Sequence, residues 1–147
     1  MRFYYLLRTA LLSLLAKRTI GVRALVINKD KVLLVKHTYQ KGWYTIGGAV
    51  DAGETPQEAL KRELKEEVGV SLTGPLELFS AYYSRNERRD DYIIFYISHS
   101  NTQEKVSSAE IAEQQWFPLN QLPDDISPAT SRRIQEYLGK SEPSEQW

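Results

Sequence analysis

A length of 147 residues suits one domain with a sizeable core, and the hydrophobic content of 41% and charged content of 26% are ordinary for a globular protein. Nineteen basic side chains balance nineteen acidic ones, which argues against general nucleic-acid binding because proteins with that function are usually strongly basic. The chain has no cysteine and two histidines, so disulfides and a thiol nucleophile are excluded and a histidine-rich zinc site is not expected.

Residues 1–17 have apolar side chains at helical spacing, which predicts an amphipathic helix. We expect it to pack on the domain or on a second subunit, which leaves a homodimer open. A membrane-surface anchor is the alternative. The uncharged run from Thr9 to Ala16 is too short to span a bilayer, and no signal-peptide cleavage pattern follows it. We therefore expect no membrane association and a cytoplasmic protein.

Two β-strands are predicted next, at residues 21–28 and 31–37, joined as a hairpin by a turn at 28–31. Consecutive apolar residues at 33–35 suggest that the second strand is buried on both faces. A loop at 40–42 follows, and residues 43–46 lead into a glycine pair, Gly47 and Gly48.

The most informative stretch runs from Gly48 to Val70. Thr55 as cap, Pro56 at the first position and Glu58 in a capping box predict a helix start, and Gly69 predicts its end. The helix carries an apolar stripe for the core at Leu60, Leu64 and Val68.

Three carboxylates of this helix, Glu63, Glu66 and Glu67, stand at i, i+3 and i+4 and are predicted to converge. Charge runs are usually solvated faces. However, like charges at this spacing repel, and a hard divalent cation, Mg²⁺ or Mn²⁺, would compensate them. Glycines beside the helix N-terminus allow the backbone to approach a phosphate. The combination favours metal-dependent chemistry on a phosphate over a solvated face.

The rest of the chain predicts strands at 76–84, 92–99 and 113–117, a helical turn at 119–123 and a final helix at 127–138. Residues 85–91 and 101–108 are predicted loops, and 140–147 a disordered tail. No internal repeat or second domain is evident. Strands flanked by helices predict one layered α/β domain over residues 18–139.

The stretch from Gly48 to Val70 resembles the complete signature of the Nudix hydrolases, whose conserved positions here are Gly48, Glu54, Arg62-Glu63-Leu64, Glu66-Glu67 and Gly69-Val70. The resemblance implies an α/β/α sandwich with a mixed sheet and the box helix at the mouth of a cleft. It also implies hydrolysis of a nucleoside diphosphate linked to another moiety. Ile46 stands where family members most often have a proline, which leaves the local loop geometry open.

Roles for several residues follow from this resemblance. Glu67 is expected to be the closest metal ligand, with Glu63, Glu66 and the Gly48 carbonyl beside it. Arg62 and Glu54 are expected to pair and fix the loop on the helix; contact between Arg62 and phosphate is the alternative.

The family often brings another glutamate over the metals from the loop before the last strand. Glu110 matches that placement and is the candidate base, with Glu104 and Glu113 as competitors. An ordinary solvated loop acid is the alternative reading of Glu110.

Substrate contacts are predicted only from residue type. Aromatic side chains that could stack a base are Tyr39, Trp43, Tyr44 and Tyr82, and arginines that could grip phosphates are Arg85 and Arg89. In strands such aromatics are more often core, and such a charged loop is more often solvated.

The predicted function is a Mg²⁺-dependent pyrophosphohydrolase, preferentially for a nucleotide sugar or ADP-ribose. The alternatives are a nucleoside triphosphate pyrophosphohydrolase and a module that senses a nucleotide without turning it over.

Overall fold

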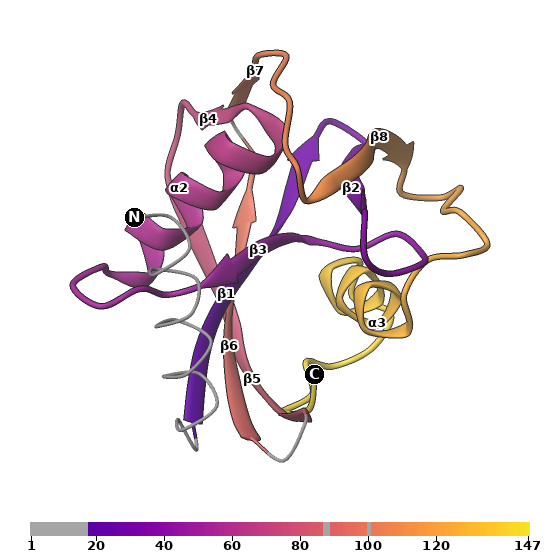
Figure 1. Ribbon diagram of the computed structural model, residues 1–147. Helices are drawn as coiled ribbons and strands as arrows, with labels where there is room; N and C mark the ends of the chain where they lie inside the picture. Colours follow the sequence, from indigo (N-terminus) through magenta and orange to yellow (C-terminus); the bar gives the residue numbers. More distant parts are fainter. Residues whose placement is uncertain (1–17, 87–88, 100) are drawn as a thin grey trace.

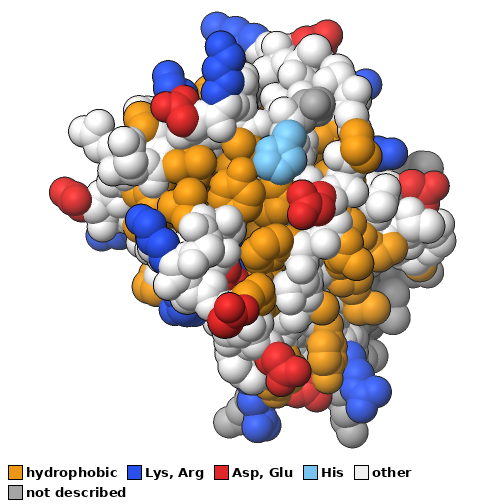
Figure 2. Space-filling model, turned by 180° about the vertical axis from the view of Figure 1, so that it is seen from behind, with side chains coloured by type: hydrophobic (Ala, Val, Ile, Leu, Met, Phe, Trp, Pro, Cys, Tyr) orange, Lys and Arg blue, Asp and Glu red, His pale blue; other side chains and the backbone are white. Residues whose placement is uncertain are grey.

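The computed structural model describes residues 18–86, 89–99 and 101–147 (Figure 1). The helix predicted at residues 1–17 lies outside this range. Within it, no helix is both long and apolar enough to cross a membrane. On the side opposite to the view of Figure 1, hydrophobic side chains gather in a band at the surface (Figure 2).

A mixed sheet forms the middle of the molecule, with the strand order β5-β6-β1-β2-β8 and β3 paired to β1. β1 pairs parallel with β6 and antiparallel with β2 and β3. The bounds are β1 (Arg18–Asn28), β2 (Lys31–His37), β3 (Ile46–Ala49), β5 (Leu76–Asn86), β6 (Arg89–Ser98) and β8 (Ile111–Pro118).

One edge of β1 is shared by two partners, and this division positions the site. The second half of β1 pairs with β2 through Val26 and Leu33, whereas the first half pairs with β3 through Val22 and Gly48. β2 and β3 meet β1 on either side of Leu25. The segment that connects β2 to β3 leaves the sheet, and the chain rejoins it at β3, which contains Gly47 and Gly48.

Alternating side chains of β1 divide the core into two layers. Val22, Ala24 and Val26 pack toward α2 (Pro56–Val68), and Leu25 and Ile27 pack toward the side that includes Ile134 of α3 (Pro128–Tyr137). This period of two is the geometry of a strand buried on both faces. The two helices therefore cover opposite faces of a mixed sheet (Figure 1), which confirms the predicted α/β/α sandwich.

The structure adds a small second sheet that the sequence pattern did not predict. β4 (Val70–Leu72) pairs with β7 (Asn101–Gln103), so the predicted loop at 101–108 begins as a strand. Gln103 holds it there: its amide donates to Val68 O (3.2 Å) and accepts from Trp116 Nε1 (3.0 Å). These partners are distant in sequence, so no local pattern indicates the pairing.

The last residues differ from the predicted disordered tail. The backbone N–H of Tyr83 donates to Glu145 O (2.8 Å), and the N–H of Trp147 donates to Tyr83 O (2.9 Å). The Trp147 ring packs edge-on against Tyr82, with centroids 5.6 Å apart. The polar composition favoured disorder, but β5 is an edge strand whose backbone groups offer hydrogen bonds to an added segment.

Candidate active site

Helix α2 carries the carboxylates, and its ends are fixed as predicted. Thr55 accepts from the Glu58 N–H while the Glu58 side chain accepts from the Thr55 N–H, a complete capping box. Gly69 ends the helix in the left-handed conformation at φ 68°. With its apolar stripe on the sheet, the helix directs Glu63 and Glu67 sideways toward β3.

The glycine pair brings the β3 backbone against these carboxylates. A Cβ at Gly48 would lie 2.6 Å from the carboxyl carbon of Glu63, and a Cβ at Gly47 would lie 2.0 Å from Val22 O. The backbone leaves no room for a side chain at Gly47, whereas at Gly48 the Glu63 carboxylate occupies the space and would have to move. The Gly47 backbone also lies near the Glu67 carboxylate and opposes the rise in its pKa.

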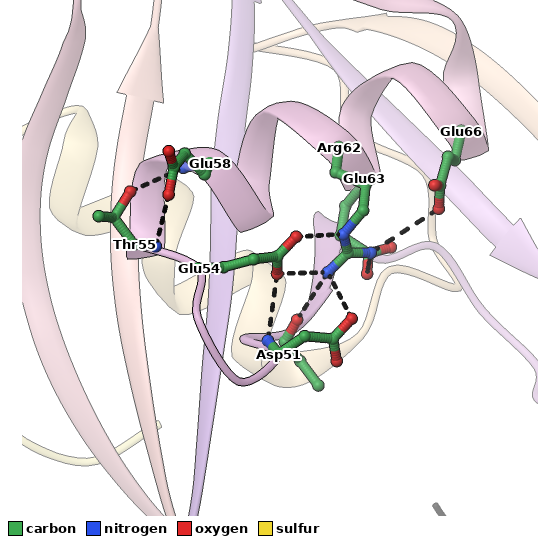
Figure 3. A network of polar contacts seen from close by, with 8 residues as sticks. Asp51, Glu54, Thr55, Glu58, Arg62, Glu63 and Glu66 are labelled. Carbon is green, nitrogen blue, oxygen red and sulfur yellow. Dashed lines mark hydrogen bonds and ion pairs between the residues drawn. The ribbon is translucent and has the colours of Figure 1, made fainter. Parts of the chain in front are cut away.

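Arg62 clamps the loop to the helix, as expected (Figure 3). Its Nε and Nη2 donate to the two carboxylate oxygens of Glu54 at 2.7 and 2.9 Å. Hydrogen bonding by Arg62 lowers the pKa of Glu54 to about 2. Arg62 also donates to Glu63 Oε1 (2.7 Å) and lies 3.7 Å from Glu66 Oε2. The predicted pair thus extends to two of the three candidate metal ligands.

Glu67 is the unusual carboxylate of the site. Its side chain is buried, with 6% of the residue exposed, and its Oε2 has no hydrogen-bond partner. Burial, reinforced by the neighbouring Glu63, raises the pKa of Glu67 to about 8, although Arg23 opposes the shift. Burial also raises the pKa of Glu63. An unpaired buried carboxylate oxygen is costly unless a cation or proton satisfies it.

These residues fit a hard divalent cation in ligand chemistry. Their donors are carboxylate oxygens, and Glu67 Oε2 lacks any other partner. Glu66 stands more in the open, with 63% of its side chain exposed, and reaches toward Arg62 (Figure 3). Within residues 18–86, 89–99 and 101–147, no group of three or more His, Cys, Asp or Glu side chains is arranged so that it could hold a metal ion.

Glu110 faces this cluster from the loop before β8. Its main-chain oxygen accepts from the Thr38 N–H (2.9 Å), and its carboxylate contributes to the raised pKa values of Glu63 and Glu67. The competitors have other surroundings. Glu113 lies 3.8 Å from Lys36 Nζ, and the Glu104 N–H donates to Gly69 O at the far end of α2.

Among the predicted substrate contacts, the structure leaves Tyr39 and Tyr44 at the site. Tyr39 is 67% exposed, and partial desolvation of its phenol, together with the charges of Glu110 and Glu67, raises its pKa. Tyr44 is half-buried and donates through its hydroxyl to Lys41 O (2.8 Å).

The other two aromatic predictions are corrected, because Trp43 and Tyr82 are core residues. Trp43 is 4% exposed and packs edge-on against Phe117. Tyr82 is 1% exposed and donates to Glu136 Oε2 (2.6 Å). Both project from their segments toward the α3 layer, where distant residues enclose them.

The arginine prediction is corrected as well. Arg85 and Arg89 lie at the far end of the β5–β6 hairpin, where Arg85 pairs in register with Asp90. In the sheet, Asp90 pairs with Arg18 of β1, whereas Gly48 of the site pairs with Val22 of β1. Arg18 and Val22 are four residues apart, so the arginine end of the hairpin lies roughly 13 Å from Gly48 along the strand direction. Neither arginine borders the carboxylates.

Sequence reasoning missed Arg23, which does border them. Arg23 lies in β1 opposite Gly47 and donates to Thr45 O (3.0 Å). It interacts electrostatically with Glu67 and Glu63. Burial lowers its pKa. Its position as the single charge within an apolar strand, GVRALVIN, was the signal that could have revealed it.

Two cavities adjoin the site and share Gln40. One of about 400 Å³ is lined by residues that include Arg23, Tyr44, Thr45, Arg132 and Trp147. The other, of about 590 Å³, is lined by residues that include Lys36, His37, Tyr39 and Lys41. Each contains a residue, Arg23 or Tyr39, that interacts electrostatically with Glu67.

Comparison with known proteins decides the family. The model of the NUDIX domain matches residues 17–137. This protein belongs to the NUDIX family. Its relatives include a putative 8-oxo-dGTP diphosphatase of Bacillus subtilis, 31% identical over 81% of this chain and 79% of that protein. The ADP-ribose pyrophosphatase of Methanocaldococcus jannaschii is 36% identical over 67% of this chain and 61% of its own length.

Solved structures agree on the fold. A MutT NUDIX hydrolase from Burkholderia pseudomallei superposes with a TM-score of 0.72 at 23% identity, covering 80% of this chain and 96% of that one. The family match and the hydrolases among the relatives place this Nudix protein among the enzymes that hydrolyse phosphorus-containing anhydrides. The family acts on small nucleotide substrates, generally with divalent metal ions.

Proposed function

We propose that this Nudix protein is a Mg²⁺- or Mn²⁺-dependent pyrophosphohydrolase. Its substrate would be a nucleoside diphosphate linked to a second moiety, as in ADP-ribose or a nucleotide sugar. The observation that carries the metal requirement is the buried Glu67 carboxylate, whose Oε2 lacks a hydrogen-bond partner next to Glu63 and the Gly47–Gly48 backbone. The M. jannaschii relative bears the name of an enzyme for one substrate of this class.

The proposed metal ligands are Glu67, Glu63 and Glu66, with the Gly48 carbonyl beside them. When bound, the ion would neutralise the charge of the anhydride and acidify an attacking water. Arg62 and Glu54 would hold the β3–α2 loop so that the glycine backbone stays against the carboxylates. Glu110 would accept the proton, because its carboxylate interacts electrostatically with Glu67 and forms no ion pair with another side chain in the described part of the protein.

The pair of cavities favours a two-part substrate. A nucleotide sugar has a group on each side of the scissile linkage, and each cavity holds a residue coupled electrostatically to Glu67. The name of the B. subtilis relative nevertheless makes an oxidised purine triphosphate the second candidate.

The test is a panel of nucleotides incubated with the purified protein and Mg²⁺, with product masses and kcat/KM measured for each. We expect ADP-ribose or a nucleotide sugar to rank first. An oxidised purine triphosphate in first place would transfer the assignment to the second candidate. Glu67→Gln tests the proposed metal site: the variant should keep the fold and lower turnover at least about a hundredfold. Near-parental turnover in a folded Glu67→Gln protein would refute it.

A further inference from the structure

The last residues form an added strand-like segment at the edge of the sheet. Gln146 pairs in parallel with Tyr83 of β5, and the flanking hydrogen bonds join Tyr83 to Glu145 and Trp147. We call residues Ser144–Trp147 the strap. Backbone pairing of this kind fixes the register, and hence the face on which each side chain lies.

Helix α3 holds the strap from its other side. Arg133 Nη1 donates to Gln146 O (3.0 Å), and Arg132 Nη2 donates to the main-chain oxygen of Trp147 (2.9 Å). Glu136 Oε1 accepts from the Ser144 N–H (3.0 Å) and from Arg133 Nη2 (2.8 Å). Arg133 is fully buried, so its charge is satisfied largely through Glu136 and the strap.

The strap thereby holds the Trp147 ring between the core and the smaller cavity. On the core side the ring packs against Tyr82 and Phe95, with centroids 5.6 and 5.7 Å away. The residue remains partly exposed and lines the cavity of about 400 Å³. Arg23 lies 5.9 Å from the ring centroid and couples the cavity to Glu67.

We propose that Trp147 is a nucleotide-binding residue whose ring forms the wall against which the base of the nucleotide stacks. This inference rests on the proposed function and adds a nucleoside subsite to it. Thr45 offers a further contact in the same cavity, since its buried Oγ1 has no hydrogen-bond partner. Stacking on an aromatic side chain accounts for roughly tenfold to a hundredfold in affinity per base.

Three substitutions separate this role from a purely structural one. Trp147→Leu keeps an apolar side chain for the core contacts but removes the flat ring, Trp147→Phe keeps a flat ring, and Trp147→Ala removes both. Trp116→Ala is the matched control, because Trp116 lies on β8 away from this cavity and bonds Gln103. Circular dichroism and thermal unfolding would establish which variants fold.

We expect Trp147→Leu and Trp147→Ala to raise KM at least about tenfold with kcat within about threefold of the parent. Trp147→Phe should recover most of the loss, and Trp116→Ala should leave KM unchanged. Binding of ADP, GDP and UDP, measured by calorimetry in EDTA, should weaken in parallel without any turnover. If Trp147→Ala does not fold, the comparison of Leu with Phe decides.

The outcomes distinguish this inference from the proposed function. If the parent binds these nucleotides but hydrolyses none of the panel, the proposed function fails, and the calorimetry still tests the stacking role. Unchanged KM and unchanged nucleotide binding in folded Trp147→Leu would overturn the inference and leave the strap with a structural role only. Failure of the parent to bind any of the three nucleotides would overturn it too.

Discussion

Glu67, a proposed metal ligand, is a glutamate that the fold buries. Its place in the i, i+3, i+4 set was predicted from helical spacing. Its burial was not, because a glutamate in a charged run gives no local sign of lying against the sheet. The structure places it beneath the glycine pair, where its carboxylate is desolvated and close to Glu63.

We expect pH to change the stability of the protein through Glu67. An acid whose folded pKa, about 8, lies above its unfolded value of 4.5 binds an extra proton when folded. The resulting stability is fully present below pH 4.5 and is lost as the pH rises toward 8. In EDTA, the midpoint of thermal unfolding should therefore fall by several degrees between pH 5.5 and 8.5.

Matched variants identify the group responsible. Glu67→Gln should flatten this dependence, whereas Glu66→Gln should retain it, because Glu66 is largely exposed. Saturating Mg²⁺ should restore stability at pH 8.5 in the parent and not in Glu67→Gln. An equally steep fall in Glu67→Gln would show that another group titrates.

Glu110 is the proposed general base, and its carboxylate interacts electrostatically with Glu63 and Glu67. We expect Glu110→Gln to lower kcat while leaving KM mostly intact, because a base acts in the transition state more than in binding. The acidic limb of the pH–rate profile should shift or flatten. Steady-state kinetics across pH would measure both.

The competing acids serve as controls for this assignment. Glu113→Gln and Glu104→Gln should be near parental, since the first pairs with Lys36 and the second belongs to the far end of α2. A slow Glu113→Gln or Glu104→Gln beside a fast Glu110→Gln would move the role. If all three were fast, the base would be a glutamate of α2.

At the scale of elements, the site depends on how closely β3 approaches β1 and α2. The capping box, Pro56 and Gly69 set the length of the helix locally, which is why its bounds were predicted closely. How closely β3 approaches β1 and α2 is decided by tertiary contacts. Gly47 has φ 149° and no room for a Cβ, whereas Gly53 in the neighbouring loop has φ 85° with nothing within 4 Å of its Cβ position.

This contrast predicts different costs for the same substitution. Gly53→Ala should cost about 1–2 kcal/mol, the strain of a left-handed alanine. Gly47→Ala should cost more than about 4 kcal/mol, because its Cβ would overlap Val22 O and push β3 from β1. Urea unfolding of both variants would measure the difference. Similar losses in the free energy of unfolding for the two variants would mean that β3 can shift easily away from Val22 O.

At the scale of the whole molecule, residues 1–17 are predicted to form an amphipathic segment that needs a surface to pack on. We expect them to pack on the domain or to join two copies, since their apolar stripe suits a protein surface and is too short to span a bilayer. Apolar side chains are exposed on the described part, among them Ile20 at 52% and Leu78 at 63%. Such residues are candidate partners for an amphipathic segment.

Deleting residues 1–17 should lower solubility or change the oligomer size, because apolar surface would lose its cover. Light scattering of the full chain and of the shortened one would measure this. Salt-sensitive co-sedimentation of the full chain with anionic vesicles would contradict this expectation and favour the membrane-surface alternative.

The sequence by itself determined the family, the layered α/β class and the helix that carries the carboxylates. The family signature and the helix depend on residues of one continuous stretch, Gly48 to Val70, so caps, glycines and helical spacing express them directly. Tertiary structure alone decided which side chains surround the site. Aromatic residues look alike in sequence, yet Trp43 and Tyr82 entered the core, whereas Tyr39 and Trp147 border the cavities. The face on which a side chain lies is decided by packing partners distant in the chain, which is why Arg23 and Trp147 meet only in the folded protein.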